Sequence, residues 1–274
     1  MITQVQFVTL ATLLSLAISG CAHPAAQPAG TPPPPRSCFL LHEVGVGRVV
    51  REPSDGCAIR VTPASTFKIP HALAALDAQV VTPEEVFPYD GRPLPQELWR
   101  HPQTMASALR VSALWYFQAL ARRLGPERER AYLQKLGYGN ADSSSGLETF
   151  WLYQSLAISP DEQEQFLLRL YADALPIDRH AQQVVRALLV QPAGVVVNAT
   201  GEHPFAQPWP AGTVVSAKTG GAAEEGRPDV RWLVGHVQRG SRSWIFVSNV
   251  VGDDLSPLSA IDLAAASLKR AGVL

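Results

Sequence analysis

The sequence predicts an α/β fold of the α+β type, in which a central antiparallel sheet is flanked by terminal helices and carries an inserted helical subdomain. Two observations predict this fold. Strand-like segments separated by turn residues occur near the start of the chain and again after residue 212, and the residues between about 80 and 190 show helical periodicity. Because strands that are neighbours in sequence tend to pair, both groups of strands are expected in one sheet.

The first segment, residues 1–21, is expected to direct export rather than to join the fold. Residues 7–21, "FVTLATLLSLAISGC", form an uncharged apolar run of signal-peptide length, which is short for a membrane span. The run ends in "ISGC", which resembles a bacterial lipobox with Cys21 as the lipidated residue. The first six residues contain no Lys or Arg, so ordinary secretion and an uncleaved anchor remain open. We expect an exported protein, either periplasmic or anchored in the membrane as a lipoprotein.

The next segment, residues 22–36, is proline-rich and is expected to be a tether that precedes a domain over residues 37–274. Within that domain, residues 38–44 and 48–52 are typical of strands joined by a turn at Gly45–Gly47. Apolar residues then recur at helical spacing in segments 65–80, 103–123, 126–136, 160–174 and 180–190.

The helix expected over 160–174 has a clear start signal, a capping box with Ser159 at N-cap, Pro160 at N1 and Glu162 at N3. Strand patterns return after it, and a last helix is expected to be capped by Ser256 and closed by Gly272. The three expected strands are residues 212–218, 230–238 and 243–250.

Cys38 and Cys57 each begin a strand-like segment, "CFLLHEV" and "CAIRV". An exported compartment permits a cross-strand disulfide between them, and two buried free thiols remain the alternative. No Cys or His cluster in the sequence has metal-ligand spacing, so no metal site is expected. With a net charge of −1, the composition does not favour a nucleic-acid partner.

Ser65 and Lys68 are three residues apart in "TPASTFKIPHALAAL" (62–76), at an expected helix start, where one side chain lies over the other. Taken alone, the pair is better explained as an N-cap serine and a surface lysine. Phe67, Ile69 and Pro70 surround the lysine with apolar groups, however, and burial favours a neutral amine. The helix N-terminus would also favour ionisation of the serine hydroxyl.

Two further motifs favour a catalytic role for Ser65 and Lys68 over the N-cap and surface-lysine explanation. Ser112 interrupts an apolar helical run, and Lys218 and Thr219 follow a β-rich segment in "VVSAKTGG" (214–221). Each has an ordinary explanation by itself, a serine bonded to its own helix and a strand that ends in a turn. Together with Ser65 and Lys68 they predict a serine acyl-transfer site. Ser65 would be the nucleophile, Lys68 its base, Ser112 a proton relay, and Lys218 with Thr219 would hold a substrate carboxylate.

This set of residues, in this order, resembles the penicillin-recognising serine enzymes. Within them, the chain resembles class D (OXA-type) β-lactamases over roughly residues 38–270. The likeness rests on "PASTFKIPHALAALD" (63–77), "YGN" (138–140), "FWLYQSLAISPDEQEQFLLRLYADALP" (150–176) and "KTG" (218–220).

The resemblance implies β-lactam substrates, resistance to these antibiotics, an acyl-enzyme on Ser65, and a general base made when carbon dioxide carbamylates Lys68, without a metal. Trp151 matches the tryptophan whose ring nitrogen bonds the carbamate. Phe67, Leu114 and Trp151 are expected to keep that pocket dry. A class A enzyme would carry a separate glutamate base in an E-x-x-x-N loop. Glu148 is the nearest candidate in this sequence, but Leu152 occupies the asparagine position, so no second carboxylate base is evident.

The resemblance also assigns the surrounding residues. The strand segment Thr219, Gly220 and Gly221 is expected to bind substrate, with the backbone N–H groups of Ser65 and Gly221 as the oxyanion hole. Tyr138, Gly139 and Asn140 are expected to shape a loop beside the site.

The sequence departs from the family pattern at two places. Leu114 replaces the usual valine of Ser-x-Val, which adds a methylene beside Lys68, and Ser259 replaces a carboxylate-binding arginine. We expect Arg231 to substitute for that arginine, and a solvated edge-strand arginine is the alternative. A β-lactam sensor, a peptidoglycan transpeptidase or carboxypeptidase, and a binding lipoprotein with a decayed site remain rival functions.

Overall fold

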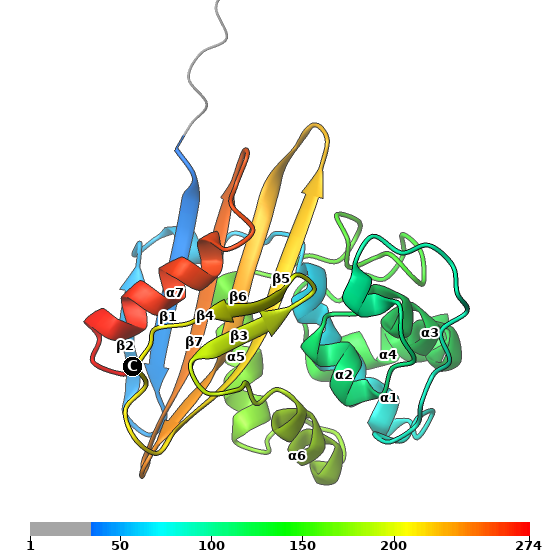
Figure 1. Cartoon of the computed structure of the whole chain (residues 1–274), viewed down its shortest axis with the longest axis horizontal. Coiled ribbons are helices and arrows are strands. Elements are labelled where there is room, and N and C mark those ends of the chain that lie inside the picture. Colours follow the sequence, from blue (N-terminus) through cyan, green and yellow to red (C-terminus); the bar gives the residue numbers. More distant parts are fainter. Residues whose placement is uncertain (1–33) are drawn as a thin grey trace, which may run out of the picture. The chain divides into compact units, whose positions relative to one another are not determined.

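The computed structural model describes residues 34–274, so the expected export signal with Cys21 and nearly all of the tether lie outside the described residues. Five strands form the predicted antiparallel sheet, in the order β2-β1-β7-β6-β5 (Figure 1). The strands are β1 (Arg36–Glu43), β2 (Gly47–Glu52), β5 (Thr213–Glu224), β6 (Arg227–Arg239) and β7 (Arg242–Gly252). The predicted sheet is confirmed, with the first hairpin and the last three strands as its members.

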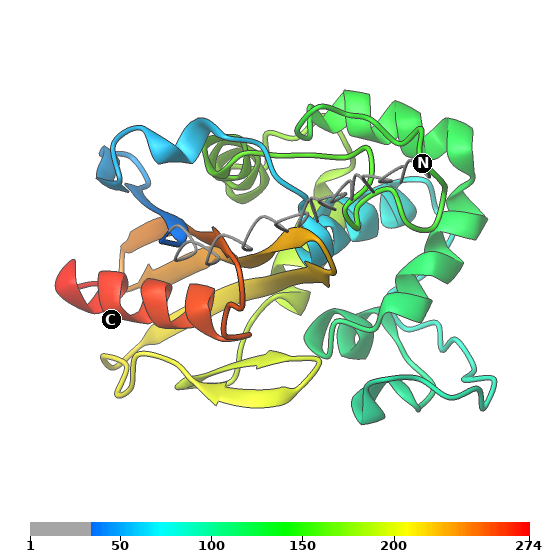
Figure 2. The ribbon, with the colours of Figure 1, turned by 90° about the horizontal axis from the view of Figure 1, so that it is seen from above.

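The sheet buries side chains on both faces because alternate residues of a strand point to opposite sides. Leu40 of β1 belongs to one apolar cluster, and its neighbours Phe39 and Leu41 belong to the other. Helix α7 (Ser259–Arg270) packs on one face and α5 (Pro160–Tyr171) on the other (Figure 2). The sheet is therefore the central layer between two helical layers.

The helical region contains α1 (Lys68–Asp77), α2 (Met105–Arg110), α3 (Leu114–Leu124), α4 (Pro126–Leu136), α5 and α6 (Arg179–Leu188). Three short 3₁₀ helices accompany them, η1 (Gly56–Ala58), η2 (Ala64–Phe67) and η3 (Glu97–Trp99). The single helix expected over 103–123 is wrong. Ser112 has a φ of 57°, which breaks the run into α2 and α3. Among the described helices, none has the length and apolar character needed to cross a membrane.

The N-termini of α5 and α7 test the two predictions of helix capping residues. The capping box at α5 is confirmed, with Ser159 Oγ accepting from the Glu162 N–H at 3.3 Å and the Glu162 carboxylate accepting from the Ser159 N–H at 2.9 Å. The cap expected from Ser256 is wrong, because α7 begins at Ser259 and the Ser256 hydroxyl instead accepts from the Leu258 N–H. A small hairpin, β3 (Val195–Asn198) and β4 (Gly201–Pro204), was not predicted.

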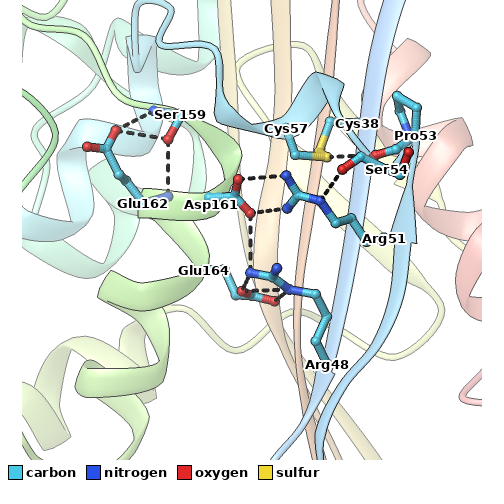
Figure 3. Close-up of a disulfide and its surroundings, with 10 residues drawn as sticks. All are labelled: Cys38, Arg48, Arg51, Pro53, Ser54, Cys57, Ser159, Asp161, Glu162 and Glu164. Carbon is cyan, nitrogen blue, oxygen red and sulfur yellow. Dashed lines mark hydrogen bonds and ion pairs between the residues drawn. A yellow bond between two sulfur atoms is a disulfide. The ribbon is translucent and has the colours of Figure 1, made fainter.

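Cys38 and Cys57 form a disulfide, which decides between the two alternatives (Figure 3). The expectation of a cross-strand bridge is wrong in one respect, since Cys57 lies in η1 and not in a strand. The same corner holds two ion pairs between β2 and α5, Arg48 with the buried Glu164 and Arg51 with Asp161. These contacts fasten α5 to the first hairpin.

Candidate active site

A cleft with a volume of about 320 Å³ opens where β5, the outermost strand, meets the helical region. It brings together residues that are up to 192 positions apart in the chain, from Ser65 to Pro257. Of the residues predicted from the sequence, seven line it: Ser65, Ser112, Leu114, Thr219, Gly220, Gly221 and Arg231.

Ser65 and Lys68 lie at the junction of η2 and α1. The Lys68 ammonium nitrogen Nζ donates to Ser65 Oγ at 2.7 Å, and the lysine is only 1% exposed. Burial lowers the pKa of Lys68 from 10.5 to about 7. The alternative explanation, an N-cap serine and a solvated surface lysine, is therefore wrong, because Lys68 is buried. A serine hydroxyl in contact with a lysine that is partly neutral near pH 7 can lose its proton to that amine.

Ser112 lines the cleft, and the buried Lys218 is in contact with it. Lys218 Nζ donates to Ser112 Oγ and to the carbonyl of Thr219, both at 2.9 Å. Burial, together with the charge of nearby Lys68, lowers the pKa of Lys218 well below its usual value. The predicted proton relay Ser112 is thus in direct contact with Lys218, which the sequence analysis assigned to the substrate carboxylate.

The position predicted for "KTG" at the end of a strand is wrong, because β5 continues to Glu224. These residues instead lie along the outer edge of the sheet, against η2. A Cβ on Gly220 would come within 3.0 Å of the Pro63 carbonyl and of the Thr66 methyl group. Glycine at this position therefore allows the strand to pack closely on the turn that carries Ser65.

Lys68 lies against one ring of a packed aromatic group, which also contains Phe67 and Trp151, two residues predicted for this pocket. Phe67 stacks on Trp151 with 5.3 Å between ring centroids, and Lys68 Nζ lies 5.5 Å from the ring centroid of Phe117. Phe117 was missed, because its position on α3 is indistinguishable in sequence from an ordinary core position. Trp151 is fully buried, and its Nε1 has no hydrogen-bond partner in the described part of the chain. We call Phe67, Phe117 and Trp151 the aromatic cage.

The "YGN" residues support the site from behind, and none of them lines the cleft. Tyr138 is buried, and its hydroxyl accepts from Gln163 Nε2 at 3.0 Å, while the same Nε2 donates to Thr66 Oγ1 at 2.7 Å. A Cβ on Gly139, which has a φ of 57°, would come within 2.2 Å of the Ala157 carbonyl. Gln163 was missed because a buried glutamine on a helix carries no distinguishing sequence signal.

Asn140 completes this loop. Its Oδ1 accepts from the Ala157 N–H at 3.0 Å, and its Nδ2 donates to the Ser155 carbonyl at 2.7 Å. These bonds hold the segment between Trp151 and α5 against the turn at residues 138–140. The contacts agree with the architectural role that the sequence predicted for the motif.

Arg231 lies on β6, between β5 and β7, and is 8% exposed, so the solvated edge-strand alternative is wrong. Its guanidinium group donates to the Ala222 carbonyl at 2.7 Å and to Asp229 at 3.1 Å. Its Nε has no hydrogen-bond partner among residues 34–274. Ser259, by contrast, does not line the cleft, although Pro257 does.

The other residues that line the cleft were not among the predicted site residues. Gln96 and Trp99 form one side, and the tip of the β3–β4 hairpin, Asn198 to Thr200, forms the other. The hairpin was missed because its strands are only four residues long. Nowhere between residues 34 and 274 do three His, Cys, Asp or Glu side chains gather as a metal site.

Comparison with known proteins gives consistent results. Residues 50–269 match the transpeptidase domain of penicillin-binding proteins. The chain is 35% identical over 237 residues to the probable β-lactamase YbxI of Bacillus subtilis (strain 168), covering 86% of this chain and 81% of that protein. It is 36% identical over 199 residues to β-lactamase OXA-10 of Pseudomonas aeruginosa, covering 72% and 69%.

Solved structures agree with these relatives. A class D β-lactamase from Bacillus subtilis superposes with a TM-score of 0.76 at 33% identity, covering 88% of this chain and 93% of that one. The C-terminal domain of the BlaR penicillin receptor of Bacillus licheniformis also gives a TM-score of 0.76, at 27% identity, covering 88% and 92%.

Proposed function

The chain belongs to the class D serine β-lactamases, and on that premise we propose that it hydrolyses β-lactams through an ester on Ser65 and thereby confers resistance to them. The observation that carries this proposal is the 2.7 Å contact between Ser65 Oγ and Lys68 Nζ, with the serine open to the cleft and the lysine buried. A nucleophile and its base are within proton-transfer distance before substrate arrives.

In the first step, Ser65 Oγ bonds to the β-lactam carbonyl carbon and the ring C–N bond breaks. The hydroxyl proton of Ser65 passes to the base at Lys68. The ring nitrogen takes a proton from Ser112, which regains one from Lys218 through their 2.9 Å contact. The backbone N–H groups of Ser65 and Gly221 stabilise the oxyanion that forms on the carbonyl oxygen. Water then gives a proton to the base at Lys68 and its oxygen bonds to the ester carbon. The Oγ–C bond breaks as Ser65 Oγ takes a proton back from that base, and the base passes its remaining proton to nearby Lys218.

We further propose that Lys68 reacts with carbon dioxide. The residues fit such a group, because the lysine has a pKa of about 7 and sits in an apolar cage. The Trp151 Nε1 donor is also buried without a partner among the described residues, and an unpaired buried N–H is costly. When bound, the carbamate would supply an oxygen as general base, held by Trp151 Nε1 and Ser65 Oγ. Leu114, at the start of α3, lines the cleft beside it.

For the substrate carboxylate we propose Thr219 and Arg231 as partners. Both line the cleft, and Arg231 has an unpaired Nε. Asp229 neutralises part of the guanidinium charge, so the carboxylate would compete with an existing ion pair.

A β-lactam sensor is the second candidate, because the BlaR receptor domain superposes equally well. The test is to mix the purified protein with a chromogenic cephalosporin, with and without bicarbonate. Turnover that bicarbonate increases is the expected result. A single burst equal to the protein concentration, with no further product, would identify a sensor or a penicillin-binding protein.

We also propose that the protein is exported and anchored through lipidated Cys21. The support is the lipobox-like "ISGC" followed by a proline-rich tether. Expressed in a bacterial host, the protein should fractionate with membranes, and C21A should shift it to the soluble or periplasmic fraction. Equal membrane association of both proteins would refute the lipid anchor.

A further inference from the structure

A buried contact between a histidine and a glutamate joins α1 to α4 and has no part in the steps described above. His71 and Glu129 are each 1% exposed, and Nε2 of the histidine lies 2.6 Å from Oε1 of the glutamate. A buried carboxylate is costly unless it is paired. Even when paired, such an ion pair contributes on average no more stability than apolar residues of the same size. Stability alone therefore does not explain why this pair is present.

The position of the histidine gives a better explanation. His71 is three residues after Lys68, so both side chains lie on one face of α1. Its imidazole touches every ring of the aromatic cage. The centroid distances are 5.2 Å to Phe67, 5.7 Å to Phe117 and 5.7 Å to Trp151.

The contact with Trp151 is edge-on, at an interplanar angle of 61°. Phe67, which stacks on the indole, and the imidazole also contact each other, so the indole packs against a pair of adjoining rings. Rotation of the His71 ring would move the surface against which Trp151 packs. Glu129 restricts that rotation, because its Oε1 lies 2.6 Å from the ring nitrogen, a close contact that does not have hydrogen-bond geometry.

We propose that the His71–Glu129 pair is a positioning element for the carbamate at Lys68. Glu129 fixes the His71 ring, and the ring fixes the cage and the Trp151 donor. This inference rests on the carbamylation that we proposed above. Partners one layer outside a bound group commonly change its affinity by about ten-fold or more when they are removed.

The test measures carbamate formation directly. The full-length protein is titrated with ¹³C-bicarbonate, and the carbamate carbon of Lys68 is followed by NMR to obtain the half-saturating concentration. The main variant is the double replacement H71L/E129L, which exchanges the pair for apolar residues. E129Q, which removes the charge and keeps the shape, is the second variant and serves if the first does not fold. Thermal unfolding is measured for each.

A matched control is E164Q, because Glu164 is another buried carboxylate paired with a side chain, Arg48, but it does not touch the cage. We expect the half-saturating bicarbonate concentration to rise about ten-fold in the pair variants and to stay unchanged in the control. Unchanged affinity in the folded pair variants would overturn this inference and leave the proposed base intact. If the wild-type protein gave no carbamate signal, the proposed base would fail, and this inference with it.

Discussion

At the scale of the residue, Trp151 carries the sharpest prediction, because its indole N–H is a buried donor without a partner among the described residues. W151F keeps an aromatic ring and removes that donor. We expect the bicarbonate concentration for half-maximal turnover to rise about ten-fold, since one hydrogen bond to a charged group is worth about 1.5–3 kcal/mol. W244F is the control, because Trp244 is equally buried but lies in the cluster under α7. A carbamate affinity that is the same in W151F and W244F would contradict the role of Trp151.

Lys68 predicts how stability depends on pH. Its pKa is about 7 in the folded protein and about 10.5 when exposed. Between these values the unfolded chain binds more protons at this position, so stability rises with pH relative to K68M. Below about pH 7 both states are protonated and the difference between the two proteins stays constant. Urea unfolding of both proteins from pH 6 to about 10, without bicarbonate, measures this difference. A difference that does not change across that range would show that Lys68 keeps its usual pKa.

Arg231 predicts a change in substrate affinity. R231A removes the cation that we assign to the substrate carboxylate, and a lost charge-assisted hydrogen bond should raise KM for penicillins about ten-fold or more. D229N is the matched control, because it releases the guanidinium group from its ion pair and leaves the cation in place. KM in D229N should not increase. An unchanged KM in R231A would show that another group binds the carboxylate.

At the scale of the element, the loop that carries Trp151 is tied to the β5–β6 hairpin at Tyr153. The hydroxyl of Tyr153 contacts the Ala222 carbonyl at 3.1 Å and also reaches the Pro228 carbonyl. Arg227 returns a hydrogen bond to the Tyr153 carbonyl. Ala222 follows Gly221, whose N–H is the proposed oxyanion donor, and Tyr153 lies two positions after Trp151. The hydrogen bond between Tyr153 and Ala222 therefore links the two parts of the site.

Y153F should loosen this connection by removing the hydroxyl alone. A net hydrogen bond is worth about 1 kcal/mol, which corresponds to a decrease in Tm of about 2–4 °C for a domain of this size. Y89F is the control, since the Tyr89 hydroxyl bonds to Arg92 within one exposed loop. Calorimetry of the two variants compares them. Equal Tm values for Y153F and the wild type would show that the hydroxyl does not hold the loop to the hairpin.

At the scale of the whole molecule, the disulfide joins the first strand to η1, with a sequence separation of 19 residues. A closed loop of this length stabilises a fold by about 3 kcal/mol, mainly by restricting the unfolded chain. C38A/C57A should therefore lower Tm by about 6–12 °C. Neither cysteine lines the cleft, so kcat/KM at 25 °C should remain that of the wild type. Loss of activity in the folded variant would connect this corner to the active site.

The sequence by itself determined the sheet, the helical region and the residues of the predicted site. Strand alternation and helical periodicity are local patterns that a short window of sequence displays. The residues Ser65, Lys68, Ser112 and Lys218 belong to short motifs, which can be identified without knowing the rest of the fold. The capping box at Ser159 was equally predictable, because all its contacts lie within four residues.

Only the tertiary structure decided what depends on residues distant in sequence. It broke the expected helix at Ser112, whose left-handed backbone is fixed by its surroundings and not by local propensity. It also buried Arg231 in a central strand, joined Cys38 to Cys57, placed Phe117 beside Lys68 and packed His71 against Phe67. Burial and contacts between residues distant in sequence depend on how side chains pack in three dimensions. That packing leaves no periodic pattern in the sequence from which it could be predicted.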